Sequence, residues 1–437
     1  MKEYDKLIKD LAPKKFGKLG QIWVSFLLVI ILFAMYAYYQ QLDKGLIITN
    51  MRDYALWGVY ISNFVFFVAI SLVGSLVTAI LRLSGASWST PLTRIAEVIA
   101  VAAIIMAGLT IIIDMGRPER IYNIFLHGRL QSPIIWDVLV ISTYLFISVL
   151  LLFFPLLPDF AILKKHFKDQ PKLSKWYGKL SLNWTGSKDQ ENLYNKSIKT
   201  LSVLIIPVAF GIHTVTAWLF ATTYRPGWDS SNFGPYFIAG AFVAGAGAVV
   251  VIMYVLRRTY HLEDYITDLH FDKMGKLLVL LCLIYLYFNV NEYLIPAYKT
   301  TTEEAAHLHE LFFGSYALLF WSVIIGGLVV PVITLVFPKG RKPFPLFIIG
   351  ILVVLGAWWK RFIIVTPTLL HPILPIQGVP KSWHSYFPSG LEWIITFGTL
   401  AAALLIMTVL FRYLPIIPIH ETAEERGFLK TDKIGKL

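Results

Sequence analysis

The stretch that decides the fold reads IIIDMGRPERIYNIFLHGRLQSPIIWD and spans residues 111–137. An apolar helix ends in it, a polar loop follows, and a second apolar helix begins. Gly116-Arg117-Pro118 is typical of a helix end, and Ser132-Pro133 is typical of a helix start. The pattern therefore predicts Asp114 at the tail of the first helix and Asp137 at the head of the second.

Asp114 and Asp137 are the strongest candidates for functional side chains. If both helices cross a membrane, the two carboxylates lie at about the same depth, where an ionisable group is costly to place. We interpret them as a proton acceptor and a hydrogen-bonding partner for a small amphiphile that arrives from the lipid. The alternative is structural: each aspartate caps a helix end or pairs with an arginine of the loop, namely Arg117, Arg120 or Arg129.

The composition of the whole chain excludes a soluble protein. Of 437 residues, 57% are hydrophobic and only 15% are charged, and the mean hydropathy is +0.64. These values are typical of a polytopic membrane protein. Cys282 is the only cysteine, which excludes disulfides and cysteine-ligated iron–sulfur clusters within this chain. No metal-ligand array is recognisable, so no metal site is expected.

Ten apolar segments are long enough to cross a bilayer, which predicts an all-α integral membrane protein. The predicted spans are residues 20–41, 54–82, 92–115, 133–157, 199–222, 234–257, 273–296, 305–337, 345–366 and 390–415. Lysine and arginine collect at the chain ends and in alternate loops. Positive loops face the cytoplasm, so both termini are predicted to be cytoplasmic and the loop after Asp114 faces outward. This asymmetry accounts for the net charge of +12 without a nucleic-acid partner.

The predicted spans form two similar halves. Trp57-Gly58-Val59-Tyr60 opens span two, and Phe233-Gly234-Pro235-Tyr236 opens span six; each apolar run then ends at the same spacing in Arg82 or Arg258. A tandem duplication of a four-helix bundle explains the match, and coincidence in a biased composition is the alternative. The predicted division is 1–53 (cytoplasmic N-terminus and first flanking helix), 54–158 (spans two to four of the first bundle), 159–198 (cytoplasmic linker), 199–222 (span five, completing that bundle), 234–366 (second bundle) and 390–437 (last helix and cytoplasmic tail).

Three further titratable residues lie in predicted spans and are candidates for a proton path. His213 lies inside span five, and the alternative for it is a packing role. Because no other histidine lies at a comparable depth, a membrane haem with two axial histidines is not expected. Glu292 closes span seven at the place that Asp114 has in the first half, with a structural polar cluster as the alternative. Glu97 lies near the cytoplasmic end of span three, where the alternative is a lone charge that reaches to the interface.

Several short stretches, ordered from about residue 54 to 415, carry a family resemblance. They are Gly116-Arg117-Pro118, the segment 132–138 with Ser142-Thr143-Tyr144, Tyr224-Arg225-Pro226-Gly227-Trp228, the segments 234–241 and 262–266, Lys360-Arg361-Phe362 and Glu392-Trp393. On these stretches the chain resembles the NrfD/PsrC family of integral membrane subunits. It is most similar to the core membrane subunits of alternative complex III.

The resemblance implies a membrane subunit of a respiratory electron-transport complex, in the plasma (inner) membrane of a prokaryote. It implies two four-helix bundles and a menaquinone or ubiquinone site near the outer face of the first bundle. The quinone is a substrate, and no haem or iron–sulfur cluster is expected in this chain. Electrons would pass between the quinone and an extracytoplasmic iron–sulfur subunit, with a molybdopterin subunit or a multihaem cytochrome c as a further partner.

The resemblance also implies roles for individual residues. An aspartate that lines the quinol site in relatives carries over as Asp137. A histidine of those relatives is replaced here by Asp114, which keeps a titratable group at the position. Arg117 and Tyr60 complete the expected quinone-binding set. A histidine that relatives often carry in span two is absent, because this chain reads Ser71-Leu72-Val73-Gly74 there, so proton translocation is a weaker expectation than quinone binding.

The sequence therefore predicts a quinone-reactive subunit of an oxidoreductase complex, for quinol oxidation or polysulfide-type reduction, that is not catalytic alone. Two other classes stay open. A secondary transporter or proton-conducting channel also uses duplicated bundles and membrane carboxylates, but it is expected to show helices broken near mid-membrane. A structural membrane anchor predicts no quinone pocket.

Overall fold

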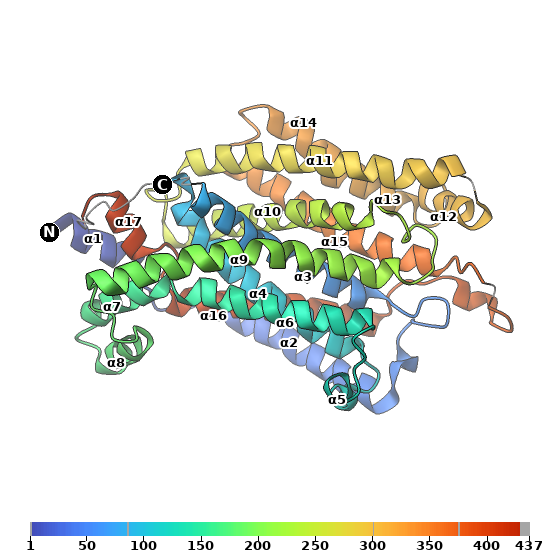
Figure 1. The fold of residues 1–437 in the computed structure, drawn as a ribbon, viewed down its shortest axis with the longest axis horizontal. Helices are drawn as coiled ribbons and strands as arrows, with labels where there is room; N and C mark the ends of the chain where they lie inside the picture. Colours follow the sequence, from blue (N-terminus) through green and yellow to red (C-terminus); the bar gives the residue numbers. More distant parts are fainter. Residues whose placement is uncertain (1, 85–86, 300, 375, 429–437) are drawn as a thin grey trace.

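The computed structural model describes residues 2–84, 87–299, 301–374 and 376–428, and the regular elements within these ranges are all helical (Figure 1). The helices are α1 (Lys2–Leu11), α2 (Lys18–Lys44), α3 (Val59–Leu83), α4 (Thr90–Asp114), α5 (Asn123–Leu126), α6 (Pro133–Phe153), α7 (Leu156–His166), α8 (Pro171–Leu180), α9 (Lys188–Ala221), α10 (Phe233–Tyr260), α11 (Asp268–Lys299), α12 (Thr302–Phe312), α13 (Ala317–Ile324), α14 (Val330–Val336), α15 (Pro343–Leu369), α16 (Gly390–Tyr413) and α17 (Ile419–Glu425). Short 3-10 turns lie between some of them.

Within the described ranges, ten helical segments are long and apolar enough to cross a membrane, which confirms the predicted all-α membrane protein with ten spans. They are α2, α3, α4, α6, α9, α10, α11, α13 with α14, α15 and α16. The local sequence determines where α4 ends and where α6 begins, and these two helix ends carry Asp114 and Asp137. Helix α4 ends at Asp114 because glycine and proline follow within four residues, and α6 begins with Pro133 in its first turn.

The helices form the two predicted bundles. In the first, α3, α4, α6 and α9 pack together, and in the second α10 packs on α11 and α15 while α14 packs on α11. Helices α3 and α10 lie against each other at the centre and are largely buried. Gly245 of α10 allows this close approach, because it lies directly against Val73 of α3. Helices α2 and α16 pack on each other and flank the first bundle (Figure 1).

Helices α1 and α17, the first and last of the described helices, lie at the same end of the bundles (Figure 1). Helix α1 packs on α17 there, and the ring centroids of Tyr4 and Phe428 are 6.2 Å apart. The lysine-rich connection that contains α7 and α8 lies at this same end. Its cytoplasmic location stays a prediction that rests on the distribution of positive charge. We call the opposite end, which carries the 115–132 loop, the outer end.

Two predicted spans differ from the observed helices. Helix α9 begins at Lys188 rather than near residue 199, because Ser187 caps it and its first turns are too polar to carry a hydropathy signal. The predicted span 305–337 is two elements: α12, and then α13 and α14 joined by a π-helical segment (Ile325–Val329). This segment widens the span without breaking it, and Gly327 lies there against Gly356 of α15. The proposed domain boundaries stay predictions.

We predict that replacing Gly245 with alanine weakens the contact between the bundles. The new Cβ would collide with Val73 and would lie 3.2 Å from the carbonyl oxygen of Ile70. Such overpacking lowers the free energy of unfolding by about 1–3 kcal/mol, which unfolding of the purified protein in mixed detergent micelles would measure. Gly211→Ala in α9 is the matched control, since nothing lies within 4 Å of its added Cβ. Equal stability of the two variants would contradict the prediction.

Candidate functional site

Asp114 is the last residue of α4, at the outer end of the first bundle. Side chains from α2 reach this helix end: Gln41 Nε2 donates to the Ile113 carbonyl at 2.8 Å, and the Tyr38 hydroxyl donates to the Ile112 carbonyl at 3.4 Å. The last carbonyls of a helix have no partner within it, so both contacts stabilise the end of α4. Asp114 Oδ1 is also buried, but no described residue donates a hydrogen bond to it.

Asp114 belongs to a group that we call the outer polar cluster, which consists of Gln41, Tyr60, Asp114, Tyr386 and Glu392. The Tyr60 hydroxyl donates to Gln41 Oε1 at 2.8 Å, and the Tyr386 hydroxyl donates to Glu392 Oε1 at 2.6 Å. Tyr386 also accepts a hydrogen bond from the first backbone N–H of α3. Glu392 is fully buried and interacts electrostatically with Asp114 and Tyr60. Tyr60 also interacts electrostatically with Asp114, and the shared site proposed for the two residues stays a prediction.

Three members of the outer polar cluster were not among the predicted site residues. Glu392 had a local signal, because Ser389 and Glu392 form a capping box at the start of α16. Gln41 is a polar residue near the end of an apolar span. Tyr386 lies in a loop and has no local signal. Its position depends on Gly58, because a Cβ there would collide with the Tyr386 hydroxyl.

Asp137 lies in α6 and is 4% exposed. The Thr216 hydroxyl of α9 donates to Asp137 Oδ1 at 2.7 Å, and Thr216 is itself buried. A buried carboxylate that accepts from a hydroxyl is partly stabilised without an opposite charge. Asp137 therefore faces the interior of the first bundle, between α6 and α9.

No hydrogen bond or ion pair in the described part of the chain joins Asp114 to Asp137. The structural alternative of ion pairs within the loop is also not observed, since neither aspartate pairs with Arg117, Arg120 or Arg129 among the described residues. Arg117 is exposed at the start of a 3-10 turn, three residues beyond Asp114. Among the described residues, both carboxylates thus lack a cation partner.

His213 is buried in α9, three residues before Thr216 and hence on the same face of the helix. Its Nδ1 lies 3.2 Å from the carbonyl oxygen of Ala209. A carbonyl oxygen only accepts, so Nδ1 carries the proton and Nε2 is the acceptor of the neutral ring. Nε2 is buried and has no partner among the residues described. His213 therefore has an open acceptor in the same bundle as Asp137.

Glu97 lies at the opposite end of α4 from Asp114, where it is buried beside two arginines. Arg82 lies 3.2 Å and Arg94 lies 3.8 Å from its carboxylate oxygens. Arg94 also pairs with Asp159 of α7 at 3.2 Å. Burial raises the pKa of Asp159, while Arg94 acts in the opposite direction. The alternative of a lone charge reaching to the interface is wrong for Glu97, because it is 2% exposed between two guanidinium groups.

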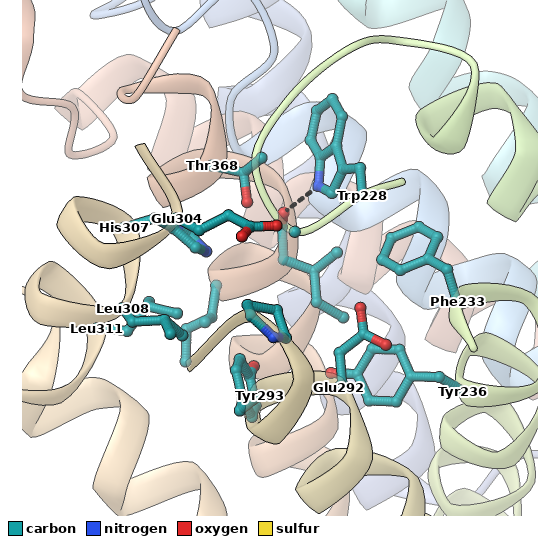
Figure 2. Close-up of a pocket in the computed structure, with 14 residues that line it drawn as sticks. Trp228, Phe233, Tyr236, Glu292, Tyr293, Glu304, His307, Leu308, Leu311 and Thr368 are labelled. Carbon is teal, nitrogen blue, oxygen red and sulfur yellow. Dashed lines mark hydrogen bonds between the residues drawn. The ribbon is translucent and has the colours of Figure 1, made fainter. Parts of the chain in front are cut away.

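Glu292 lies in α11 at the outer end of the second bundle. Its Oε2 accepts hydrogen bonds from the Ser230 hydroxyl at 2.8 Å and from Asn232 Nδ2 at 3.1 Å. Its Oε1 is buried and has no partner in the described ranges. Figure 2 shows this carboxylate beside Tyr236, at a small cavity that His307 lines from the other side. Glu292 therefore shares burial and an open oxygen with Asp114, but it belongs to a separate site.

The titratable side chains of the described residues are too scattered to form a metal site: no three of histidine, cysteine, aspartate and glutamate come together there. The expected absence of a resident metal, haem or iron–sulfur cluster stays a prediction. The same holds for the roles assigned to Asp114, Asp137, Arg117 and Tyr60.

We predict that Thr216→Val destabilises the first bundle. The valine fills the same space but leaves the buried Asp137 Oδ1 without a donor, which costs about 1–3 kcal/mol in the free energy of unfolding. Thr214→Val is the matched control, because the Thr214 hydroxyl only donates to the Phe210 carbonyl of its own helix. The two variants would be compared by unfolding in mixed detergent micelles, and a Thr216→Val protein as stable as the control would refute the role of this bond.

Comparison with known proteins places the chain in a family. The family model "Polysulphide reductase, NrfD" matches residues 47–373. The chain is 28% identical to a protein of Halobacterium salinarum named as a membrane subunit of dimethyl sulfoxide reductase, over 95% of this chain and 96% of that protein. It is 24% identical to a protein of Mesobacillus selenatarsenatis named as a subunit of selenate reductase, over 92% of this chain and 97% of that protein. It is 22% identical to the menaquinone reductase integral membrane subunit of Nitratidesulfovibrio vulgaris, over 91% of this chain and 92% of that protein. With its ten apolar helices, the chain is a multi-pass integral membrane protein that belongs to the polysulphide reductase NrfD family.

Proposed function

We propose that this protein is the membrane subunit of a quinone-linked oxidoreductase complex, and that its first bundle binds the quinone. The single observation that carries the proposal is the open, buried Oδ1 of Asp114 within the outer polar cluster. Family membership and the names of the relatives, which are membrane subunits of reductases, support the same conclusion. The specific resemblance to alternative complex III stays a prediction.

The proposed chemistry is proton exchange with the quinone head group. During quinol oxidation, Asp114 accepts a proton from one quinol hydroxyl, and Asp137 takes the second proton or relays the first. The two electrons leave to an iron–sulfur cluster of an extracytoplasmic partner, and the quinol becomes a quinone. Reduction reverses each step. A carboxylate that is buried without a cation partner suits this role, because proton uptake removes an uncompensated charge.

A lipid-soluble substrate needs access from the bilayer, and the 115–132 loop offers it. Large apolar side chains of this loop are exposed, among them Phe125 at 76% and Leu130 at 75%. Such residues suit the boundary between headgroups and acyl chains. Tyr60, whose hydroxyl donates to Gln41 Oε1, would accept a hydrogen bond from a quinol hydroxyl inside the bundle, and Arg117 would donate to a quinone oxygen from the loop.

The proposed partners dock at the outer end. The nearest is an extracytoplasmic iron–sulfur subunit, with a molybdopterin subunit or a multihaem cytochrome c beyond it. Coupling to proton translocation, in the plasma membrane of a prokaryote, is a further part of the proposal. Its candidate residues are His213, which has an open Nε2, and Glu292, which has an open Oε1. Glu97 is the weakest of the three candidates, because two arginines already neutralise it.

No observation favours the transporter or the channel over this proposal. The π-helical segment in the eighth span keeps its backbone helical, and Gly327 within it packs against Gly356 of α15. A structural anchor is distinguished by its lack of a quinone site. Extraction of quinone from the purified complex would separate the anchor from the proposed subunit.

We predict that Asp114→Asn and Asp137→Asn each lower quinol-dependent reduction of the partner by at least about 100-fold, since each removes a proton acceptor. Turnover of the purified complex with a soluble quinol analogue is the measurement. Glu119→Gln is the matched control, because Glu119 is an exposed acid in the same outer loop. Unchanged turnover in both aspartate variants would refute the assigned roles.

A further inference from the structure

A groove runs between α2 and α16, the two helices that flank the first bundle (Figure 1). Its walls are apolar side chains of α2 from Trp23 to Phe33 and of α16 from Ile394 to Leu404. Phe33 and Phe397 are more than half exposed, so the groove opens away from the bundle, which in a membrane means toward lipid. None of its lining residues belongs to the outer polar cluster.

The groove is as long as one leaflet of a bilayer is thick. From Trp23 to Phe33 the helix rises about 15 Å, which is half of a hydrocarbon core of about 30 Å. Trp23 lies in the second turn of α2, and its Nε1 donates to the Thr408 hydroxyl of α16 at 3.2 Å. Tryptophan is enriched at the boundary between acyl chains and headgroups. The groove therefore begins at headgroup level, at the end of the bundles that carries α1 and α17, and extends toward the middle of the bilayer.

A cation lies at the headgroup end of the groove. Arg412 follows Thr408 by one helical turn and Leu404 by two, so the three side chains share one face of α16. The Arg412 guanidinium lies over the rings of Phe16 and Tyr413, at 5.7 Å and 5.5 Å from their centroids. Arg412 forms no ion pair with any residue that the structure describes. Its charge at the membrane surface is thus open to an anion from outside the chain.

Exposed lysines add to the positive charge at this end of the groove. Three of them flank Phe16 in the sequence, namely Lys14, Lys15 and Lys18. Helix α8 adjoins Tyr413, because the ring centroids of Trp176 and Tyr413 are 5.6 Å apart, and it carries three more: Lys172, Lys175 and Lys179. Neither residues 11–20 nor α8 contain an acid. Asp10 precedes the first segment, and its carboxylate accepts from the Tyr265 hydroxyl at 3.3 Å.

We propose that this groove binds an anionic phospholipid, with one acyl chain between α2 and α16 and the phosphate at Arg412 and the lysines beside Phe16. A guanidinium forms two parallel hydrogen bonds with a phosphate, and basic residues next to a membrane attract anionic lipids. This end is predicted to be cytoplasmic, and the cytoplasmic leaflet carries the anionic lipids. An apolar helix of a partner would fill the groove but would leave the cations without an anion. The site does not depend on quinone binding.

Photolabelling of the full-length protein in nanodiscs of phosphatidylcholine tests the proposal. Two probe lipids carry the same acyl chain with a diazirine, one on phosphatidylglycerol and one on phosphatidylcholine. Illumination links the chain to the nearest side chain, and peptide mass spectrometry locates the adduct. We expect the phosphatidylglycerol probe to label residues 23–33 and 394–404 at least about five-fold more than the phosphatidylcholine probe, which is the preference that one basic residue at the membrane surface provides.

Substitutions separate the role of the cation from that of the groove. We expect Arg412→Gln to lower the preference for phosphatidylglycerol about five-fold, and Arg412→Lys to retain most of it. Lys339→Gln is the matched control, because it removes an exposed lysine beyond α14 of the second bundle. Leu400→Trp fills the groove and should abolish labelling there by both probes. Leu32→Trp, at an exposed position of α2 that does not line the groove, should leave the labelling unchanged.

Equal labelling of the groove by the two probes would overturn the proposal, and so would an unchanged preference in Arg412→Gln. A groove that is labelled in the purified chain but protected in native membrane vesicles would show that a partner subunit covers it, which also contradicts the proposal. If Arg412→Gln does not fold, Lys15→Gln combined with Lys18→Gln, both at exposed positions, takes its place with the same expected outcome. These measurements do not involve quinone turnover, so the proposed function stands or falls separately.

Discussion

The lack of water inside a bilayer is the constraint on which this structure depends. Backbone groups are satisfied within helices, so ten spans can pack against one another and against lipid. Ionisable side chains have no such internal solution and must find a partner, a ligand or an ordered water. The positions of the few buried charges are therefore the most informative feature of the molecule.

The two ends of the bundles treat their buried charges differently. At the end that carries the termini, Glu97 and Asp159 lie against Arg82 and Arg94, so each buried acid has an opposite charge. At the outer end, Asp114 has a buried oxygen with no partner among the described residues and interacts with a second acid rather than a cation. The ion pairs at the first end satisfy the buried charges, whereas the unpartnered Asp114 oxygen leaves a group at the outer end that can react.

The two bundles also differ, although their spans follow the same order. In each, a tyrosine in the first turns of the leading helix lies near an acid at the outer end: Tyr60 near Asp114, and Tyr236 near Glu292. The first pair lies beside flanking helices and next to an exposed apolar loop. The second pair is covered by α12, and only a small cavity remains. A repeated framework has thus given the acid at the outer end of each bundle different surroundings.

The sequence by itself determined the ten spans, the two bundles and the family, because hydropathy, loop charge and short ordered motifs are local properties. It also identified Asp114 and Asp137, since an acid within an apolar run is visible without a structure. Only the tertiary structure decided which groups these acids meet: Thr216 for Asp137, and Glu392 with Tyr60 for Asp114. Residues far apart in the chain meet through helix packing, which short-range patterns do not encode. The same reason explains why Glu97, isolated in the sequence, lies between two arginines in the folded protein.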